Sequence, residues 1–169
     1  MIAYRLVLTR RHVYDLLEDG KVIAQLAFRG SPRARVTTNH GRFDLEAFEG
    51  IRKRVVRSGD HDSTIARASS LGRYAIDLTT TTLYWHSLPG RARAYCWMTG
   101  EADVVARYLP AAGGDFRVEF EESSLSAEER EHALIVGAYL LTRIGIGIGP
   151  YEQQPAAETS DENSPLAQS

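Results

Sequence analysis

The stretch from Ser126 to Gly149 constrains the fold more than any other part of the chain. Ser126 followed three residues later by Glu129 is a capping box, which indicates the start of a helix. From Ala133 to Leu141 no residue is charged, so the polar stripe of an ordinary surface helix is missing. A helix that is apolar on every face is either enclosed by protein or spans a bilayer.

Length decides between these two environments. A membrane span needs about 20 mainly apolar residues. The apolar segment from Ala133 to Gly149 has 17, is interrupted by Thr142 and Arg143, and has no basic cluster beside it. We therefore expect an enclosed helix and not an integral membrane protein. The three glycines near its end each cost about 1 kcal/mol in a helix, so we place the helix at residues 126–144.

The chain before this helix is typical of short strands. Apolar residues alternate with polar ones, and Gly, Pro, Asn or Asp separate the runs. Asp19-Gly20 is the strongest hairpin signal. The alternation favours about twelve strands, near residues 4–9, 12–18, 22–28, 33–38, 43–47, 51–58, 64–69, 71–78, 83–87, 93–98, 104–109 and 116–120. Their spacing suits a barrel or a sandwich, and the lack of intervening helices argues against a doubly wound sheet.

This order of elements resembles the tubby C-terminal-like superfamily, which includes the phospholipid scramblases and the LURP-one-related proteins. Three local phrases are similar to segments of that family: residues 19–24 (Asp-Gly-Lys-Val-Ile-Ala), 83–85 (Leu-Tyr-Trp) and 104–107 (Val-Val-Ala-Arg). The resemblance implies a mainly β fold, with a closed barrel of about twelve antiparallel strands enclosing the C-terminal hydrophobic helix. Physically, a barrel of that size is too wide for side chains alone to fill, and a helix solves this. The expected domain covers residues 1–149.

Composition sets broad limits on partners and location. The net charge is −2, which does not indicate a nucleic-acid partner. Cys96 is the single cysteine, so no internal disulfide can form, and we expect a reducing, cytoplasmic location with at most peripheral membrane contact. Residues 150–169 are polar, acidic and poor in large apolar side chains, and we expect this tail to be disordered. No cofactor motif is present, and the sequence indicates no cofactor.

One segment concentrates basic side chains. Residues 29–57 hold 8 basic and 3 acidic residues. If the strands in this segment are neighbours, a patch for anionic lipid head groups or phosphate-bearing ligands could form from Arg33, Arg35, Arg42, Arg52, Lys53 and Arg54. The alternative is a solvated barrel wall on which Asp44 and Glu46 are cross-strand partners of the arginines.

Two further groups of residues permit chemistry but favour a structural interpretation. Asp60, His61 and Asp62 resemble metal ligands, yet three such residues in a row after Gly59 usually form a turn. Cys96 is a conceivable nucleophile, but its place in a strand favours burial.

A set of aromatic residues is open to two interpretations as well. Tyr84, Trp85, Tyr95 and Trp97 lie on two successive strands, near Arg91 and Arg93. They could stack on bases or lie at a lipid interface, but cross-strand packing is the commoner arrangement.

The function that these observations favour is a non-catalytic binding module that contacts an anionic surface through its arginines. In the tubby-like family, basic surface residues bind anionic lipid head groups. The alternative is a protein-interaction or scaffold domain that uses the acidic tail or a barrel edge. An enzyme is the least favoured of the three.

Overall fold

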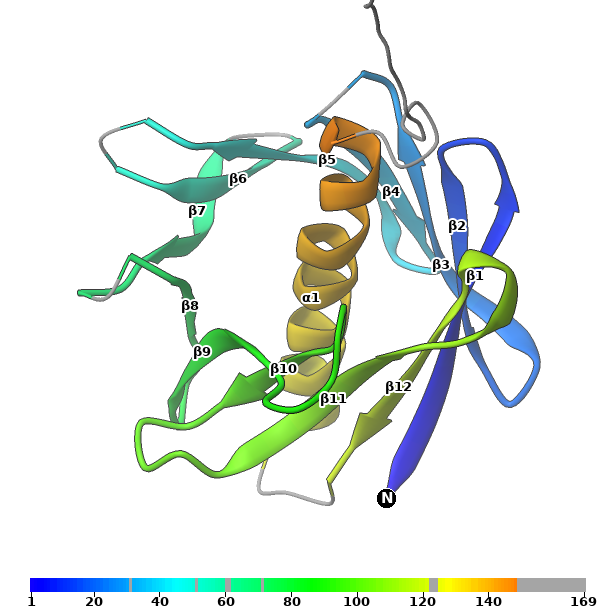
Figure 1. Ribbon diagram of the computed structural model, residues 1–169. Helices are drawn as coiled ribbons and strands as arrows, with labels where there is room; N and C mark the ends of the chain where they lie inside the picture. The colour runs from blue at the N-terminus through cyan, green and yellow to red at the C-terminus, as the bar shows by residue number, and fades with distance from the viewer. Residues whose placement is uncertain (31, 51, 60–61, 71, 122–124, 149–169) are drawn as a thin grey trace, which may run out of the picture.

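Twelve strands form one closed antiparallel barrel in the computed structural model (Figure 1). The structure describes residues 1–30, 32–50, 52–59, 62–70, 72–121 and 125–148, without the side chains of 144–148. Each strand pairs with the next one in the chain, and β1 pairs with β12 to close the ring. The predicted fold class is therefore confirmed. The strands are β1 (Ile2–Arg10), β2 (Val13–Glu18), β3 (Lys21–Phe28), β4 (Ala34–Thr38), β5 (Gly41–Phe48), β6 (Arg54–Ser58), β7 (Ser63–Ala68), β8 (Tyr74–Asp77), β9 (Thr82–Ser87), β10 (Tyr95–Met98), β11 (Val104–Pro110) and β12 (Phe116–Phe120).

Turn chemistry sets the ends of the strands. Asp19 and Gly20 have φ values of 50° and 77° and join β2 to β3 as a two-residue hairpin, which suits the asparagine, aspartate and glycine preference of such turns. Three of the candidate basic residues were expected on strands but precede them, because β4 begins at Ala34 and β6 at Arg54. These three residues are Arg33, Arg52 and Lys53. A short 3-10 turn (η1, Ala112–Gly114), not anticipated, connects β11 to β12.

Helix α1 (Ala127–Ile148) begins at the predicted capping box. The backbone N–H of Glu129 donates to Ser126 Oγ at 3.1 Å, and the N–H of Ser126 donates to the Glu129 carboxylate at 3.0 Å. The helix extends four residues beyond the predicted end at 144. Glycine lowers helix propensity but keeps its backbone donor, so Gly145 and Gly147 weaken the helix without interrupting its hydrogen bonds. Residues 150–169, expected to be disordered, lie outside the described residues.

The barrel surrounds the apolar part of α1 (Figure 1). Every residue from 133 to 142 is buried, including Tyr139 and Leu140 at 0% and 1% exposure. The strands supply the surrounding layer, in which Leu6, Leu16 and Leu26 have no exposed surface. Burial of this kind is worth about 1.5–3 kcal/mol for each large apolar side chain. No helix in the described part of the chain is long and apolar enough to cross a membrane.

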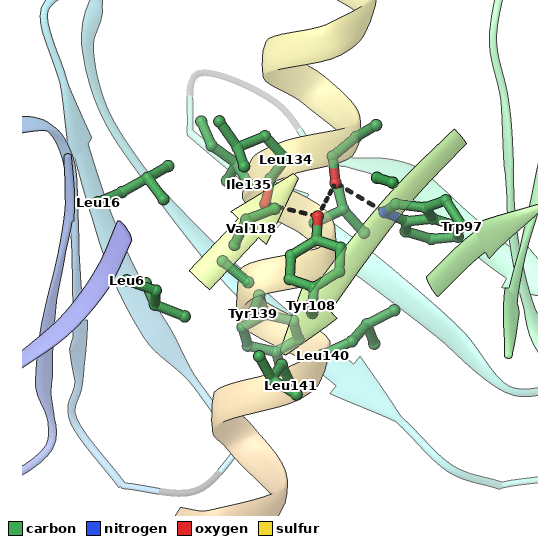
Figure 2. Close-up of a cluster of buried hydrophobic side chains, with 14 of the residues drawn as sticks. Leu6, Leu16, Trp97, Tyr108, Val118, Leu134, Ile135, Tyr139, Leu140 and Leu141 are labelled. Atoms are coloured by element: carbon green, nitrogen blue, oxygen red, sulfur yellow. Dashed lines mark hydrogen bonds between the residues drawn. The ribbon is translucent and has the colours of Figure 1, made fainter. Parts of the chain in front are cut away.

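Two aromatic side chains hold α1 against the β10–β11 wall. Trp97 Nε1 donates to the Ala133 carbonyl at 2.9 Å, and the Tyr108 hydroxyl donates to the same carbonyl at 3.2 Å (Figure 2). This approach requires a glycine one turn further on. A Cβ at Gly137 would lie 2.2 Å from the Tyr108 hydroxyl oxygen and 2.8 Å from Trp97 Nε1.

Tyr139 holds the helix to the other side of the barrel. Its hydroxyl donates to the Pro32 carbonyl and accepts the backbone N–H of Ala47 at 2.8 Å. Its ring stacks on Phe28 of β3, with centroids 5.9 Å apart. The helix is thus fixed at two levels, by β10 and β11 near its start and by the β3 and β5 side further along.

We predict that Leu140→Asp prevents soluble expression. Leu140 is 1% exposed, and an unpaired buried carboxylate costs several kcal/mol, a large part of the 5–15 kcal/mol that stabilises a typical domain. Val22→Asp is the control, because Val22 is 51% exposed. Comparison of soluble yields measures the effect, and equal yields for the two variants would contradict the enclosure of α1.

Gly137→Ala should destabilise the protein by about 1–3 kcal/mol or more, because the added methyl group overlaps Tyr108 and Trp97. Intrinsic propensity alone would stabilise this helix position by about 1 kcal/mol, so the two effects have opposite signs. Chemical denaturation measures the difference, and Gly50→Ala is the control, since no heavy atom lies within 4 Å of its Cβ position. A more stable Gly137→Ala variant would show that α1 does not approach this wall closely.

The capping box should make stability depend on pH. Its backbone hydrogen bonds, first of all the one to Ser126, lower the pKa of Glu129 below its usual value of 4.5. A carboxyl whose pKa is lower in the folded state stabilises the protein above its unfolded pKa and loses that contribution as pH falls through the folded one. The stability difference between wild type and Glu129→Ala should therefore be constant above about pH 5.5 and shrink below about pH 4.5. Denaturation curves across this range would show a constant difference if the carboxylate were not involved.

Candidate functional site

Strands β4, β5 and β6 are neighbours in the barrel, as the arginine patch requires. The six basic residues predicted from the sequence nevertheless separate into three environments. One pair is neutralised on the outer wall, one group lies at the β5–β6 connection, and Arg42 lies at the opposite end of β5.

Arg33 and Arg35 share one carboxylate. Arg33 donates to Asp44 from Nε at 3.0 Å and from Nη2 at 2.8 Å, and Arg35 Nε donates to the other oxygen of Asp44. Arg33 Nη1 also lies 3.8 Å from Glu46. The bonds from Arg35 and Arg33 lower the pKa of the Asp44 carboxyl, which is 9% exposed. These two arginines therefore have the cross-strand carboxylate partners that the alternative interpretation anticipates.

The second group, which we call the β5–β6 rim, consists of Phe48, Arg52, Lys53 and Arg54. The Arg54 guanidinium lies over the Phe48 ring, 4.7 Å from its centroid, and Phe48 is 38% exposed. Across the β6–β7 pair, Arg54 faces Arg67. Arg52 is exposed and has no ion pair among the described residues.

The carboxylate between Phe48 and Arg52 in the sequence is already engaged. Glu49 accepts the Tyr74 hydroxyl at 2.5 Å and lies 3.1 Å from Arg143 of α1. Lys53 is more constrained than its neighbours, because its Nζ donates to the Gly72 carbonyl at 3.1 Å and lies 3.9 Å from Glu49. Arg52 and Arg54 thus remain as cations whose charge no neighbouring carboxylate offsets in the described part of the chain.

The third environment is a cavity of about 920 Å³ at the end of the barrel where α1 begins. It lies between the first turns of α1 and the β4–β7 wall. Arg42 and Arg57 are its basic residues, and neither has an ion pair among the residues that the structure describes. Its apolar lining comes from Phe43, Ile65 and Ile135. We call this space the entry cavity.

Arg57 occupies an inward position of β6. It pairs with Leu45, which has no exposed surface, and lies two residues after the fully buried Val55. Its guanidinium stacks on Phe43 at 4.0 Å from the ring centroid. Val55 and Val56 are both apolar, but only Val55 points into the barrel. The sequence alone does not indicate which of the two faces the interior. In the sequence, Arg57 belongs to the basic segment, and no local signal distinguishes it from the other arginines.

His132 lines the same cavity from α1. Burial lowers the pKa of His132; the Ile65 carbonyl opposes this, and the charge of Arg57 lowers the pKa further. The imidazole is therefore neutral at neutral pH and contributes a polar but uncharged wall. Two carboxylates, Glu128 and Glu131, line the cavity at the outer end of this helix face.

The remaining candidates that the structure describes are Cys96 and Asp62. Cys96 is buried, and burial raises the pKa of its thiol, which keeps the thiol protonated. Asp62 is exposed, whereas Asp60 and His61 lie outside the described residues. Among the residues described, no three His, Cys, Asp or Glu side chains come together as a metal site.

The aromatic set packs internally, as expected. The Trp85 ring stacks on Tyr95 with centroids 5.5 Å apart and meets Trp97 edge-on at 4.9 Å. Trp85 and Trp97 are 8% and 0% exposed, which leaves neither ring free to stack on a base. Tyr84 is half-buried, and Arg91 and Arg93 are exposed.

Comparison of the chain with protein-family models, with curated proteins and with solved structures gave no match.

Proposed function

We propose that the protein is a non-catalytic binding module of the tubby-like type that contacts anionic lipid head groups through the β5–β6 rim. This proposal depends on which arginines have a carboxylate partner. Arg52 and Arg54 are exposed without such a partner in the described chain. Arg33 and Arg35, in contrast, are both paired with Asp44. The expected patch is thereby reduced to its rim members.

The rim combines the two properties that a peripheral contact needs. Each basic residue near an anionic leaflet contributes about 1 kcal/mol of attraction. Aromatic rings favour the interface between head groups and hydrocarbon, and Phe48 is one of the few large apolar side chains on the surface. Because the Arg54 guanidinium lies over the Phe48 ring, a membrane would meet charge and ring at one place.

The engagement of Glu49 supports the same function. A free carboxylate beside Arg52 and Arg54 would oppose an anionic surface, but Glu49 is bonded to Tyr74 and Arg143. Arg67, across from Arg54, is held by Asp77 at 2.6 Å and is not counted among the free charges of the rim. Glu49 is itself half-exposed, but its charge is paired with Arg143 beside the rim.

A protein-interaction role is the alternative function. A strand edge would be the usual contact for pairing with another chain. Every described strand is paired on both sides because the barrel is closed, so strand addition has no free edge there. The alternative then depends on the tail, residues 150–169.

Co-sedimentation with phosphatidylcholine vesicles, with and without phosphatidylserine, tests the proposal. Wild type should bind only the vesicles that contain phosphatidylserine, and binding should weaken as salt rises. Arg52→Gln with Arg54→Gln removes two charges and should weaken binding by about 2 kcal/mol, or about 30-fold.

The matched control is Arg5→Gln with Arg117→Gln. These exposed residues face each other on β1 and β12, on the wall opposite β6, and their loss changes the net charge by the same amount. Equal weakening in both double variants would mean that net charge, not the rim, governs binding. Binding that is independent of salt and of phosphatidylserine would refute the proposal.

A further inference from the structure

The entry cavity lies at the other end of β6 from the rim and needs an explanation of its own. Its volume of about 920 Å³ is within the range of small-molecule sites, roughly 300–1,000 Å³. Its lining is divided between apolar side chains and a few charged ones, which is also typical of such sites. The question is which ligand its chemistry suits.

The position of α1 accounts for the space. Trp97 and Tyr108 hold the start of the helix on the β10–β11 wall, and Gly137 allows the close approach. A helix is about 10–12 Å wide with its side chains and does not fill a twelve-stranded barrel when it lies against one wall. The unfilled side is the β4–β7 wall, where the entry cavity lies. A register shift between β6 and β7 at Val55–Val56 also places Ile65 at the cavity.

Arg57 is the feature that indicates a ligand. It stands at an inward position whose neighbours, Leu45 and Val55, are fully buried apolar residues. The Arg57 side chain nevertheless reaches solvent, so its charge does not have to be neutralised within the protein. Arg57 has no ion pair within the described chain and contacts only the face of Phe43 among the rings. Its guanidinium donors therefore remain available to an anion in the cavity.

The rest of the lining selects among anions. Phe43, Ile65 and Ile135 form an apolar wall beside Arg57 and fit a hydrocarbon portion of the ligand. Glu128 and Glu131 lie at the helix start and would repel a multiply charged group. His132 is neutral at neutral pH and adds no second positive charge, whereas Arg42, also at the cavity, does. A single negative charge on an apolar body suits this arrangement best.

We propose that the entry cavity binds an amphiphilic monocarboxylate, such as a fatty acid, with its carboxylate on Arg57 and its hydrocarbon part against Phe43, Ile65 and Ile135. A carboxylate matches the planar fork of a guanidinium and can accept two hydrogen bonds from it. The site is separate from the β5–β6 rim, and neither proposal depends on the other.

Isothermal titration calorimetry with dodecanoate below its micelle concentration tests the assignment. Wild type should bind dodecanoate saturably. Arg57→Gln should weaken binding roughly tenfold or more, because a charged hydrogen bond is lost. Arg5→Gln, an equal change of charge on the outer wall, should leave the affinity unchanged. Arg57 is exposed to solvent, so the variant should keep the fold, and a thermal melt checks this.

Three related compounds with the same chain separate the contributions. Dodecanol has an uncharged head group, dodecyl phosphate has a more negative one than dodecanoate, and dodecyltrimethylammonium has a positive one. Each of the three should bind at least about tenfold more weakly than dodecanoate. No saturable binding of dodecanoate would overturn the proposal. Equal binding of dodecanol would exclude Arg57 as the anchor, and preference for the cation would show that Glu128 and Glu131 dominate. Tighter binding of dodecyl phosphate would overturn the monocarboxylate assignment.

Discussion

The enclosure of an apolar helix by a closed sheet is the constraint on which the whole structure depends. Residues 133–142 of α1 cannot face water without exposing a continuous apolar surface, and the twelve-stranded barrel cannot be filled by its own side chains. The barrel covers the apolar surface of the helix, and the helix occupies space inside the barrel that the strand side chains cannot fill. The barrel also has no free strand edge among its described strands, which removes the usual route to edge-to-edge association.

A few directional bonds decide where the helix lies inside this container. Hydrophobic contact is non-directional and would tolerate several positions of α1 in a wide barrel. The bonds of Trp97 and Tyr108 to the Ala133 carbonyl select the β10–β11 side, and Tyr139 sets the depth through Pro32 and Ala47. Gly137 is the residue without which this position is sterically blocked. The entry cavity is the geometric consequence on the opposite wall.

Local pattern predicted the elements well but not how the basic residues are partnered, for physical reasons. Alternation of period two and the Asp19-Gly20 turn are local signals, and the strands lie close to where they indicate. Pairing of Arg33 and Arg35 with Asp44 depends on the register between β4 and β5, which local pattern does not contain. Arg57 is the sharpest case: with Val55 and Val56 both apolar, either face of β6 could be the inner one, and only the pairing with β5 resolves it.

Closure also limits where a function can reside on such a fold. With the strands fully paired and the interior occupied by α1, ligands can reach only the outer wall and the two ends. Much of the outer wall near β4 and β5 is neutralised by its own carboxylates, as Asp44 shows for Arg33 and Arg35. Cations without such partners occur at both ends of β6, where Arg54 stacks on an exposed ring and Arg57 on one inside the cavity. The same pair of groups, a guanidinium on an aromatic face, thus fits the anionic surface proposed for the rim at one end and the single anion proposed for the entry cavity at the other.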